Sequence, residues 1–274
     1  MRAIFTILML RRSSIMKIPG LSLLLLAGML SACVTTTTGG FNVEPSDEEA
    51  LDDYVQLAIA YYDAGDLPGA RRHINNALEI NDRNSDIYNV LALIFQREGD
   101  LDLADENFRR SIRLDRTNSR ARNNYAALLF SRGQYEEAYE QLEQVTADTM
   151  YEGRAIAFEN LGRSALALEN SRDAELAFQR ALQLNGNLYV SAVELALLRA
   201  QRQDWEGARQ AFRQYLTTAD FYNIPHTPRA LLAGISIESK FQNEELVRDF
   251  TRILTTLYRE SPEFEAYLEL TDAN

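Results

Sequence analysis

Apolar positions along this chain follow one spacing that occurs five times. In each copy a large apolar residue is followed at once by a small one, thirteen positions later by an alanine, and four positions after that by another large apolar residue. The pairs are Leu57-Ala58, Leu91-Ala92, Tyr125-Ala126, Leu161-Gly162 and Leu195-Ala196, the alanines are Ala70, Ala104, Ala138, Ala174 and Ala208, and the later large residues are Ile74, Phe108, Leu142, Phe178 and Phe212. Apolar residues three and four positions apart share one face of a helix, so each copy predicts two helices packed together.

The small residues explain how the two helices of a copy can pack closely. Ala58 and Ala70 allow the backbones to approach where the helices cross, and Leu57 and Ile74 fill the space around them. A glycine recurs in the turn, where a positive φ ends the first helix at little cost; these glycines are Gly65, Gly99 and Gly133. A 34-residue period with this pattern is typical of the tetratricopeptide repeat (TPR), whose units stack into a superhelix. We therefore predict an all-α TPR superhelix.

The register of the pattern gives about six repeats between residues 51 and 270. Their predicted ranges are 51–84, 85–118, 119–152, 155–188 and 189–222, then a degenerate sixth at 226–262 and a terminal cap helix at 263–270. In the sixth, the helices are expected near Thr227–Ser239 and Asn243–Glu260, and Pro262 is expected to end the unit. We find no linker inside 51–270, so the solenoid is predicted to be one domain.

The N-terminal part of the chain has the organisation of a lipoprotein signal peptide, predicted at 1–32. It carries four basic and no acidic residues, and an apolar run from Ile18 to Leu30 follows. This run is shorter than the roughly 20 residues that span a bilayer as a helix. It ends in Leu-Ser-Ala-Cys, which resembles the lipobox of bacterial lipoproteins, so Cys33 is predicted to be acylated after cleavage just before it. The alternatives are a secreted protein without lipid and an uncleaved anchor.

Two further observations concern this leader. Met16 and Lys17 begin a compact signal by themselves, which favours Met16 as the translation start over a longer functional leader from Met1. Residues 33–50 contain the lipidated cysteine and a Thr- and Gly-rich tether without apolar periodicity. Val34 stands where proteins of this kind have Asp if they stay in the inner membrane. The expected location is therefore the periplasmic face of the bacterial outer membrane.

Charge and residue types narrow the function further. The chain has 40 acidic and 28 basic residues and a formal net charge of −12, so no nucleic-acid partner is expected and membrane contact is assigned to the lipid anchor. His73 and His226 lie in different repeats with no other ligand at metal spacing. His73 is expected at the surface or rim, and Trp205 at a packing position between helices, with a partner anchor as the alternative. We predict no enzyme activity, catalytic residue, metal, cofactor or small-molecule substrate.

The first helix of each repeat is expected to line a groove for a protein partner. The predicted groove residues are Val55, Ile59, Tyr62, Asn89, Leu93, Gln96, Asn123, Ala127 and Phe130. For Val55 and Leu93, packing against adjacent helices is an equal alternative, whereas the three amide residues are expected to be exposed. The groove has no lysine for clamping a terminal carboxylate, which favours a basic or amphipathic segment as its ligand.

Short segments of the chain resemble one family of lipoproteins. These segments are Asn123-Asn124-Tyr125-Ala126 with Gly133 and Glu137-Ala138, Ala155 to Asn160-Leu161-Gly162, Ala211-Phe212-Arg213-Gln214-Tyr215-Leu216, and Ser261-Pro262-Glu263-Phe264. Together with the lipobox, the tether and six repeats, they are similar to the type IV pilus biogenesis and stability lipoproteins, the secretin pilotins of the PilF/PilW type. The resemblance implies binding to secretin subunits, their localisation to the outer membrane and their multimerisation. The alternative is a general envelope adaptor that recruits peptidoglycan or division proteins.

Overall fold

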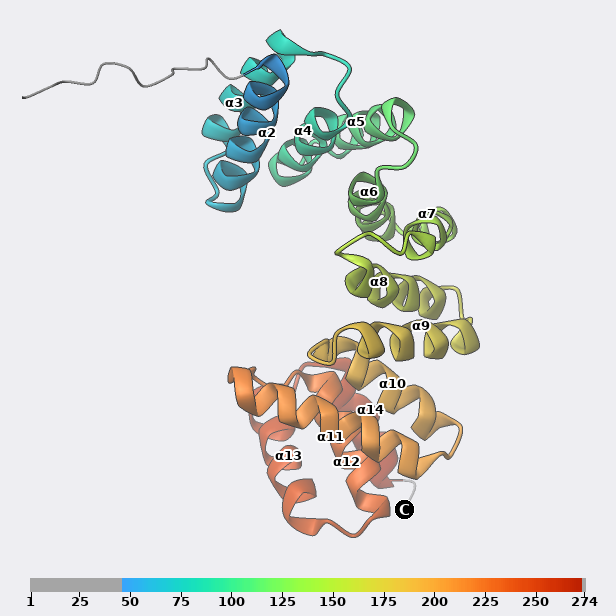
Figure 1. Ribbon diagram of the computed structural model, residues 1–274. Coiled ribbons are helices and arrows are strands. Elements are labelled where there is room, and N and C mark those ends of the chain that lie inside the picture. Colours follow the sequence, from blue (N-terminus) through green and yellow to red (C-terminus); the bar gives the residue numbers. More distant parts are fainter. Residues whose placement is uncertain (1–45, 273–274) are drawn as a thin grey trace, which may run out of the picture. The chain divides into compact units, whose positions relative to one another are not determined.

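The computed structural model describes residues 46–272, and within this range it is all helical (Figure 1). Six helix pairs follow one another. Their first helices are α2 (Asp47–Asp63), α4 (Ser85–Glu98), α6 (Ser119–Ser131), α8 (Arg154–Ala167), α10 (Tyr189–Gln201) and α12 (Pro228–Lys240). Their second helices are α3 (Leu67–Ile80), α5 (Leu101–Leu114), α7 (Tyr135–Ala147), α9 (Ser171–Leu184), α11 (Trp205–Tyr222) and α13 (Glu244–Leu257), and α14 (Pro262–Asp272) is last. The predicted all-α fold is confirmed, whereas the predicted signal peptide and Cys33 lie outside the described residues.

Local sequence signals set where the helices begin and end. Ser46 and Glu49 form a capping box at the start of α2, in which the Ser46 hydroxyl accepts from the Glu49 N–H and the Glu49 carboxylate accepts from the Ser46 N–H. The turn glycines Gly65, Gly99 and Gly133 all have positive φ. In the later pairs Glu169, Gln203 and Gln242 take this conformation, which costs more for a residue with a Cβ. The positive φ at this turn position is therefore a feature of the repeat that does not require glycine.

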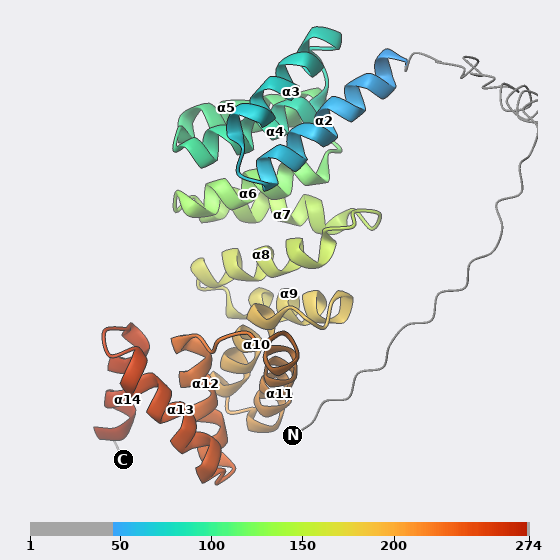
Figure 2. The ribbon, with the colours of Figure 1, turned by 90° about the vertical axis from the view of Figure 1, so that its left-hand side faces the viewer.

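From α2 to α13 each helix packs against its neighbours in sequence, so the described part of the chain is a stack of pairs (Figure 2). Every first helix also contacts the first helix of the next pair, from α2 with α4 through α10 with α12. The second helices contact the following first helix, and α14 packs on α12. Contacts limited to adjacent units are what make a solenoid.

The small residues of the repeat lie where the helices of a pair cross, as predicted. The alanines named in the pattern are buried without exposed surface, among them Ala58, Ala70 and Ala208. Gly162 shows why the position must be small, because a Cβ there would lie 2.7 Å from a carbon of the Phe178 ring. Around these crossings the large residues form three apolar clusters along the stack.

Two residues differ from the sequence expectations. Leu57 is 42% exposed because α2 contacts α3 and α4 but has no preceding helix pair in the described chain. Trp205 is only half-buried at the start of α11, with the Lys240 ammonium 5.1 Å from the centre of its ring. His73, in contrast, is half-buried in contact with the rings of Tyr54 and Tyr61, which is consistent with the expected rim position.

The sixth helix pair ends at a different residue from the one predicted. Helix α13 ends at Leu257 and not near Glu260, and Pro262 begins α14 instead of ending the unit. Proline suits the first turn of a helix, where its missing N–H has no partner to lose. The turn before α12 is held by His226, whose Nδ1 lies 2.6 Å from the Tyr215 hydroxyl and whose carbonyl accepts from the Tyr258 hydroxyl.

The environment of His226 predicts a pH dependence of stability. Its ring packs on Tyr215 and Phe250, and burial lowers its pKa below the usual value. In the unfolded chain this histidine has a pKa of about 6.5, so below that pH the folded chain binds fewer protons at His226 than the unfolded chain. The free energy of unfolding should therefore fall as the pH drops through this value. We expect the urea midpoint to fall less between pH 7.5 and 5.5 in His226→Gln than in the native chain.

The slopes with pH are compared here, not the absolute midpoints, because the substitution also removes packing. The Asp220 carboxylate lies beside the same turn and is unchanged in both chains. Equal slopes in the two proteins would contradict a half-buried His226 that is kept neutral by its surroundings.

Candidate partner-binding surface

Helices α2, α4 and α6 carry the nine predicted groove residues, and the structure divides them by exposure. Ala127 is exposed, Val55 and Asn89 are buried, and the rest are half-buried. Val55 therefore belongs to the core around α2 and α3, while Leu93 and Phe130 lie at the edge of the next cluster. The expected exposure of Asn89 is wrong, because only 1% of this residue is accessible.

Amide side chains connect successive first helices. The Asn124 amide donates to Oδ1 of Asn89 over 3.0 Å, and the Asn160 amide donates to Oδ1 of Asn123 over 3.3 Å. A buried amide is costly without such a partner, so the contact between α4 and α6 both covers Asn89 and satisfies it. Asn123, by contrast, stays half-buried.

Two predicted aromatic residues are each covered by an arginine of a following first helix. The Arg97 guanidinium lies 3.6 Å from the centre of the Tyr62 ring and also donates to the Tyr62 carbonyl. The Arg163 guanidinium lies 4.8 Å from the centre of the Phe130 ring. Arginines on aromatic faces are common in recognition surfaces. Sequence reasoning missed both arginines, although each follows its aromatic partner by about one repeat.

Predicted and unpredicted residues meet in a hollow of about 170 Å³ between α6 and α8. Ala127 and Phe130 line it from α6, and Asn160, Arg163 and Ser164 line it from α8. The Ser164 hydroxyl is buried and has no hydrogen-bond partner in the described part of the chain. An apolar wall, one guanidinium and an unsatisfied hydroxyl suit a side chain of a protein partner.

Other kinds of site are not found in the described residues. Between residues 46 and 272 there is no group of three or more His, Cys, Asp or Glu side chains that could hold a metal ion. No helix in that range is long and apolar enough to cross a membrane. The hollow between α6 and α8 is thus the feature that best fits the predicted surface.

Comparisons with known proteins match the chain to repeats and to pilus proteins. Tetratricopeptide repeat models match residues 55–104, 96–150 and 159–223. A type IV pilus assembly protein, PilF of Pseudomonas aeruginosa, is 31% identical over 244 residues, which are 89% of this chain and 95% of the relative.

Solved structures agree with this match. One, described as a functional characterization of Pseudomonas aeruginosa pilF, superimposes with a TM-score of 0.76 at 32% identity and covers 82% of this chain and 99% of that chain. PilW, described as a widely conserved type IV pilus biogenesis factor, has a TM-score of 0.65 at 23% identity, with 80% and 99% covered. At that identity PilW supports the fold alone.

Proposed function

Because the chain belongs to the family of PilF-like type IV pilus TPR proteins, we propose that it is an outer-membrane lipoprotein that binds secretin subunits and promotes their assembly. The observation that carries this proposal is the similarity over 89% of the chain to a type IV pilus assembly protein. The Leu-Ser-Ala-Cys sequence before the repeats supports the lipid anchor at Cys33. The pilotin would act at the periplasmic face of the membrane.

A tethered scaffold promotes assembly by raising the local concentration of what it binds. Lipid at Cys33 and a tether of a few tens of ångströms would keep the repeats close to the membrane. Secretin subunits held by the repeats would then meet at a much higher effective concentration than in the periplasm.

We assign secretin binding to the surface of the first helices. The hollow at Ala127 and Phe130 would receive an apolar side chain of the secretin segment. Asn123 and Asn160, with half-buried amides, would bond to the backbone of that segment. Arg163 would add a polar contact to the segment, and the buried, unpartnered Ser164 hydroxyl would do so from the wall of the hollow.

The anchor makes a specific prediction for cells that lack this gene. We expect secretin multimers in the membrane fraction to fall while total secretin stays unchanged. The native chain should restore the multimers, whereas Cys33→Ala should restore them poorly because the protein is no longer held at the membrane. The measurement is the ratio of heat-resistant multimer to monomer after membrane fractionation.

The same experiment distinguishes the general envelope adaptor. Normal secretin multimers in the outer membrane of cells without the gene would contradict the pilotin proposal and favour the general envelope adaptor. Equal rescue by Cys33→Ala and the native chain would remove the anchor from the mechanism. The level of each protein in whole cells must be matched, so that a change in abundance is not taken for a change in assembly.

A further inference from the structure

Another candidate surface contains many charged side chains and lies near the second helices of two successive pairs, α5 and α7. Residues 109–122 contain six arginines and one acidic residue in a chain with a net charge of −12. The arginines are Arg109, Arg110, Arg113, Arg116, Arg120 and Arg122. Within the described range, Arg109 alone of the six forms an ion pair, with Asp105 at 2.8 Å. The end of α5 and the start of α6 thus carry five arginines that form no ion pair within the described range.

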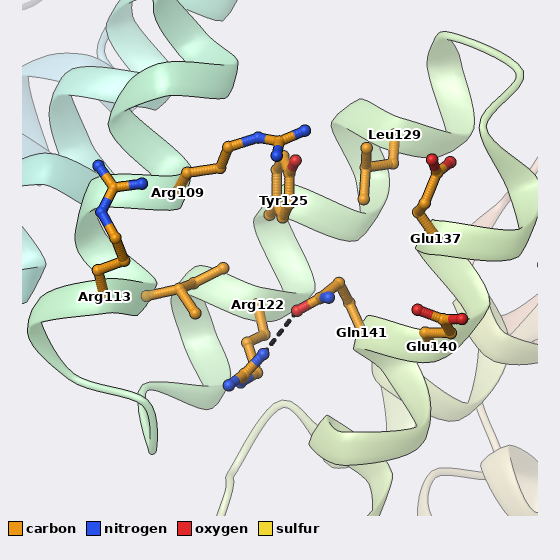
Figure 3. A pocket seen from close by; sticks show the side chains of 9 residues that line it. Arg109, Arg113, Arg122, Tyr125, Leu129, Glu137, Glu140 and Gln141 are labelled. Atoms are coloured by element: carbon orange, nitrogen blue, oxygen red, sulfur yellow. Dashed lines mark hydrogen bonds between the residues drawn. The ribbon is translucent and has the colours of Figure 1, made fainter.

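Part of this charge lines a groove of about 370 Å³ between α5, α6 and α7, shown in Figure 3. Arg109 and Arg113 stand on α5 at one side, and Glu137 and Glu140 stand on α7 at the other. The apolar part of the lining between them comes from Ile112, Tyr125 and Leu129. The groove therefore has a basic wall, an acidic wall and apolar surface between them. We call it the charged groove.

The guanidinium of Arg122 lies inside the charged groove and forms no ion pair within the described range. It donates to Oε1 of Gln141 over 2.6 Å and to the carbonyl of Arg116 over 3.0 Å. Burial, and next the nearby Arg116, lower the pKa of this guanidinium. Its position is fixed by neutral acceptors alone, so it is held ready for an anionic group at little further cost in side-chain entropy.

The chain contains its own comparison for this groove. A hollow of about 290 Å³ between α9, α10 and α11 lies 70 residues further along the repeats. Gln179 and Gln183 stand there in place of Arg109 and Arg113, and Gln210 in place of Glu140. Leu182 and Leu195 stand in place of the apolar Ile112 and Tyr125, whereas Arg199, which pairs with Glu175 over 3.5 Å, stands in place of Leu129. The repeat therefore folds without the two opposed charged walls.

We infer that the charged groove binds an amphipathic helical segment of a protein partner, with carboxylates along the edge that faces α5 and basic side chains along the edge that faces α7. The opposed walls match such a helix by charge, and the apolar surface between them buries its apolar face. A membrane of anionic lipids fits less well, because Glu137 and Glu140 would face the same headgroups. None of the nine groove residues of the first helices lines this surface, so the inference does not rest on secretin binding.

The test uses the full chain in detergent and labelled helical peptides that share one apolar face. The first peptide has Glu on one edge and Lys on the other, and the second has Gln in place of Glu. We expect the Glu peptide to bind about tenfold tighter than the Gln peptide, with a difference that shrinks between about 50 and 500 mM salt. In the variant Arg109→Gln with Arg113→Gln, which copies the two glutamines of the later hollow, the advantage of the Glu peptide should be strongly reduced, with Arg122 as the remaining arginine of the groove.

Two controls separate charge in the groove from charge elsewhere. Arg172→Gln with Arg248→Gln removes two exposed arginines from α9 and α13 and should keep the preference for the Glu peptide. Arg109→Glu with Arg113→Glu should reverse it, so that a peptide with Lys on both edges binds best.

Equal binding of the Glu and Gln peptides to the native chain, or a preference of unchanged size in Arg109→Gln with Arg113→Gln, would overturn the inference. Vesicles of phosphatidylglycerol are tested in parallel. If the vesicles bind the native chain but not Arg109→Gln with Arg113→Gln, and the peptides show no preference, the charged groove binds lipid and not a protein.

Discussion

Phe212→Ala is expected to lower the free energy of unfolding by about 3–5 kcal/mol, the usual loss for a large aromatic side chain removed from a core. Phe212 of α11 has no exposed surface. Its ring packs against Tyr215 and Phe250, with ring centres 5.4 and 5.9 Å apart. It also lies directly over Gly234 of α12, so the helices already touch around the ring and cannot close much of the cavity.

The same helix provides a matched control in Phe221, which is 75% exposed. Phe221→Ala is expected to change the free energy of unfolding by less than about 0.5 kcal/mol, as is usual at an exposed position. Both variants are compared with the native chain by urea unfolding followed by circular dichroism. A similar loss in the two variants would show that the crossing of α11 and α12 is not a tightly packed core.

Glu238→Ala is the second change for which we expect a large loss, of about 3 kcal/mol. The Glu238 side chain is 3% exposed and receives two hydrogen bonds from Arg209, the closer at 2.9 Å, and one from Asn243. Removing the carboxylate leaves the guanidinium and the amide without their acceptor in a poorly hydrated place. The loss stays near the lower end of the range for broken buried pairs because Arg209 is partly exposed and can turn towards water.

The control for this pair is an exposed ion pair in the neighbouring helix. Asp249 and Arg252 of α13 are 3.1 Å apart, and both side chains are more than half exposed. Asp249→Ala should cost less than about 1 kcal/mol, because water and salt already screen the pair. If the two variants show equal losses, burial does not decide the strength of these pairs.

The fold follows from the sequence because one register fixes both helices of every repeat. Ala58, Ala70 and Gly162 could be placed at helix crossings from spacing alone, since a larger side chain at any of them would separate two backbones. Leu57 obeys the same spacing but is exposed, because its burial requires a preceding repeat. Spacing thus predicts which face a residue occupies, whereas burial also depends on whether a neighbour exists.

The candidate surfaces were predictable only in part, because they depend on contacts between different repeats. Asn89 was expected to be exposed, and no pattern within its own helix shows that the Asn124 amide covers it. Arg163 over Phe130 joins two repeats in the same way. The charged groove was missed because Arg113 and Glu140 lie on second helices, where polar residues normally mean no more than a solvated face.

Secretin binding by the first helices is tested most directly with a residue that can be enlarged without harm to the core. Ala127 is exposed and lines the hollow between α6 and α8, so Ala127→Arg fills the hollow from outside. The matched control is Ala147→Arg on α7, which makes the same change in charge and size at another exposed alanine.

The measurement is the affinity of the full chain, purified in detergent, for the secretin subunit. We expect the native chain and Ala147→Arg to bind alike, and Ala127→Arg to bind at least about tenfold more weakly. Secretin binding that is equal for all three proteins would contradict the assignment to this hollow, and no binding by the native chain would contradict the proposed function itself.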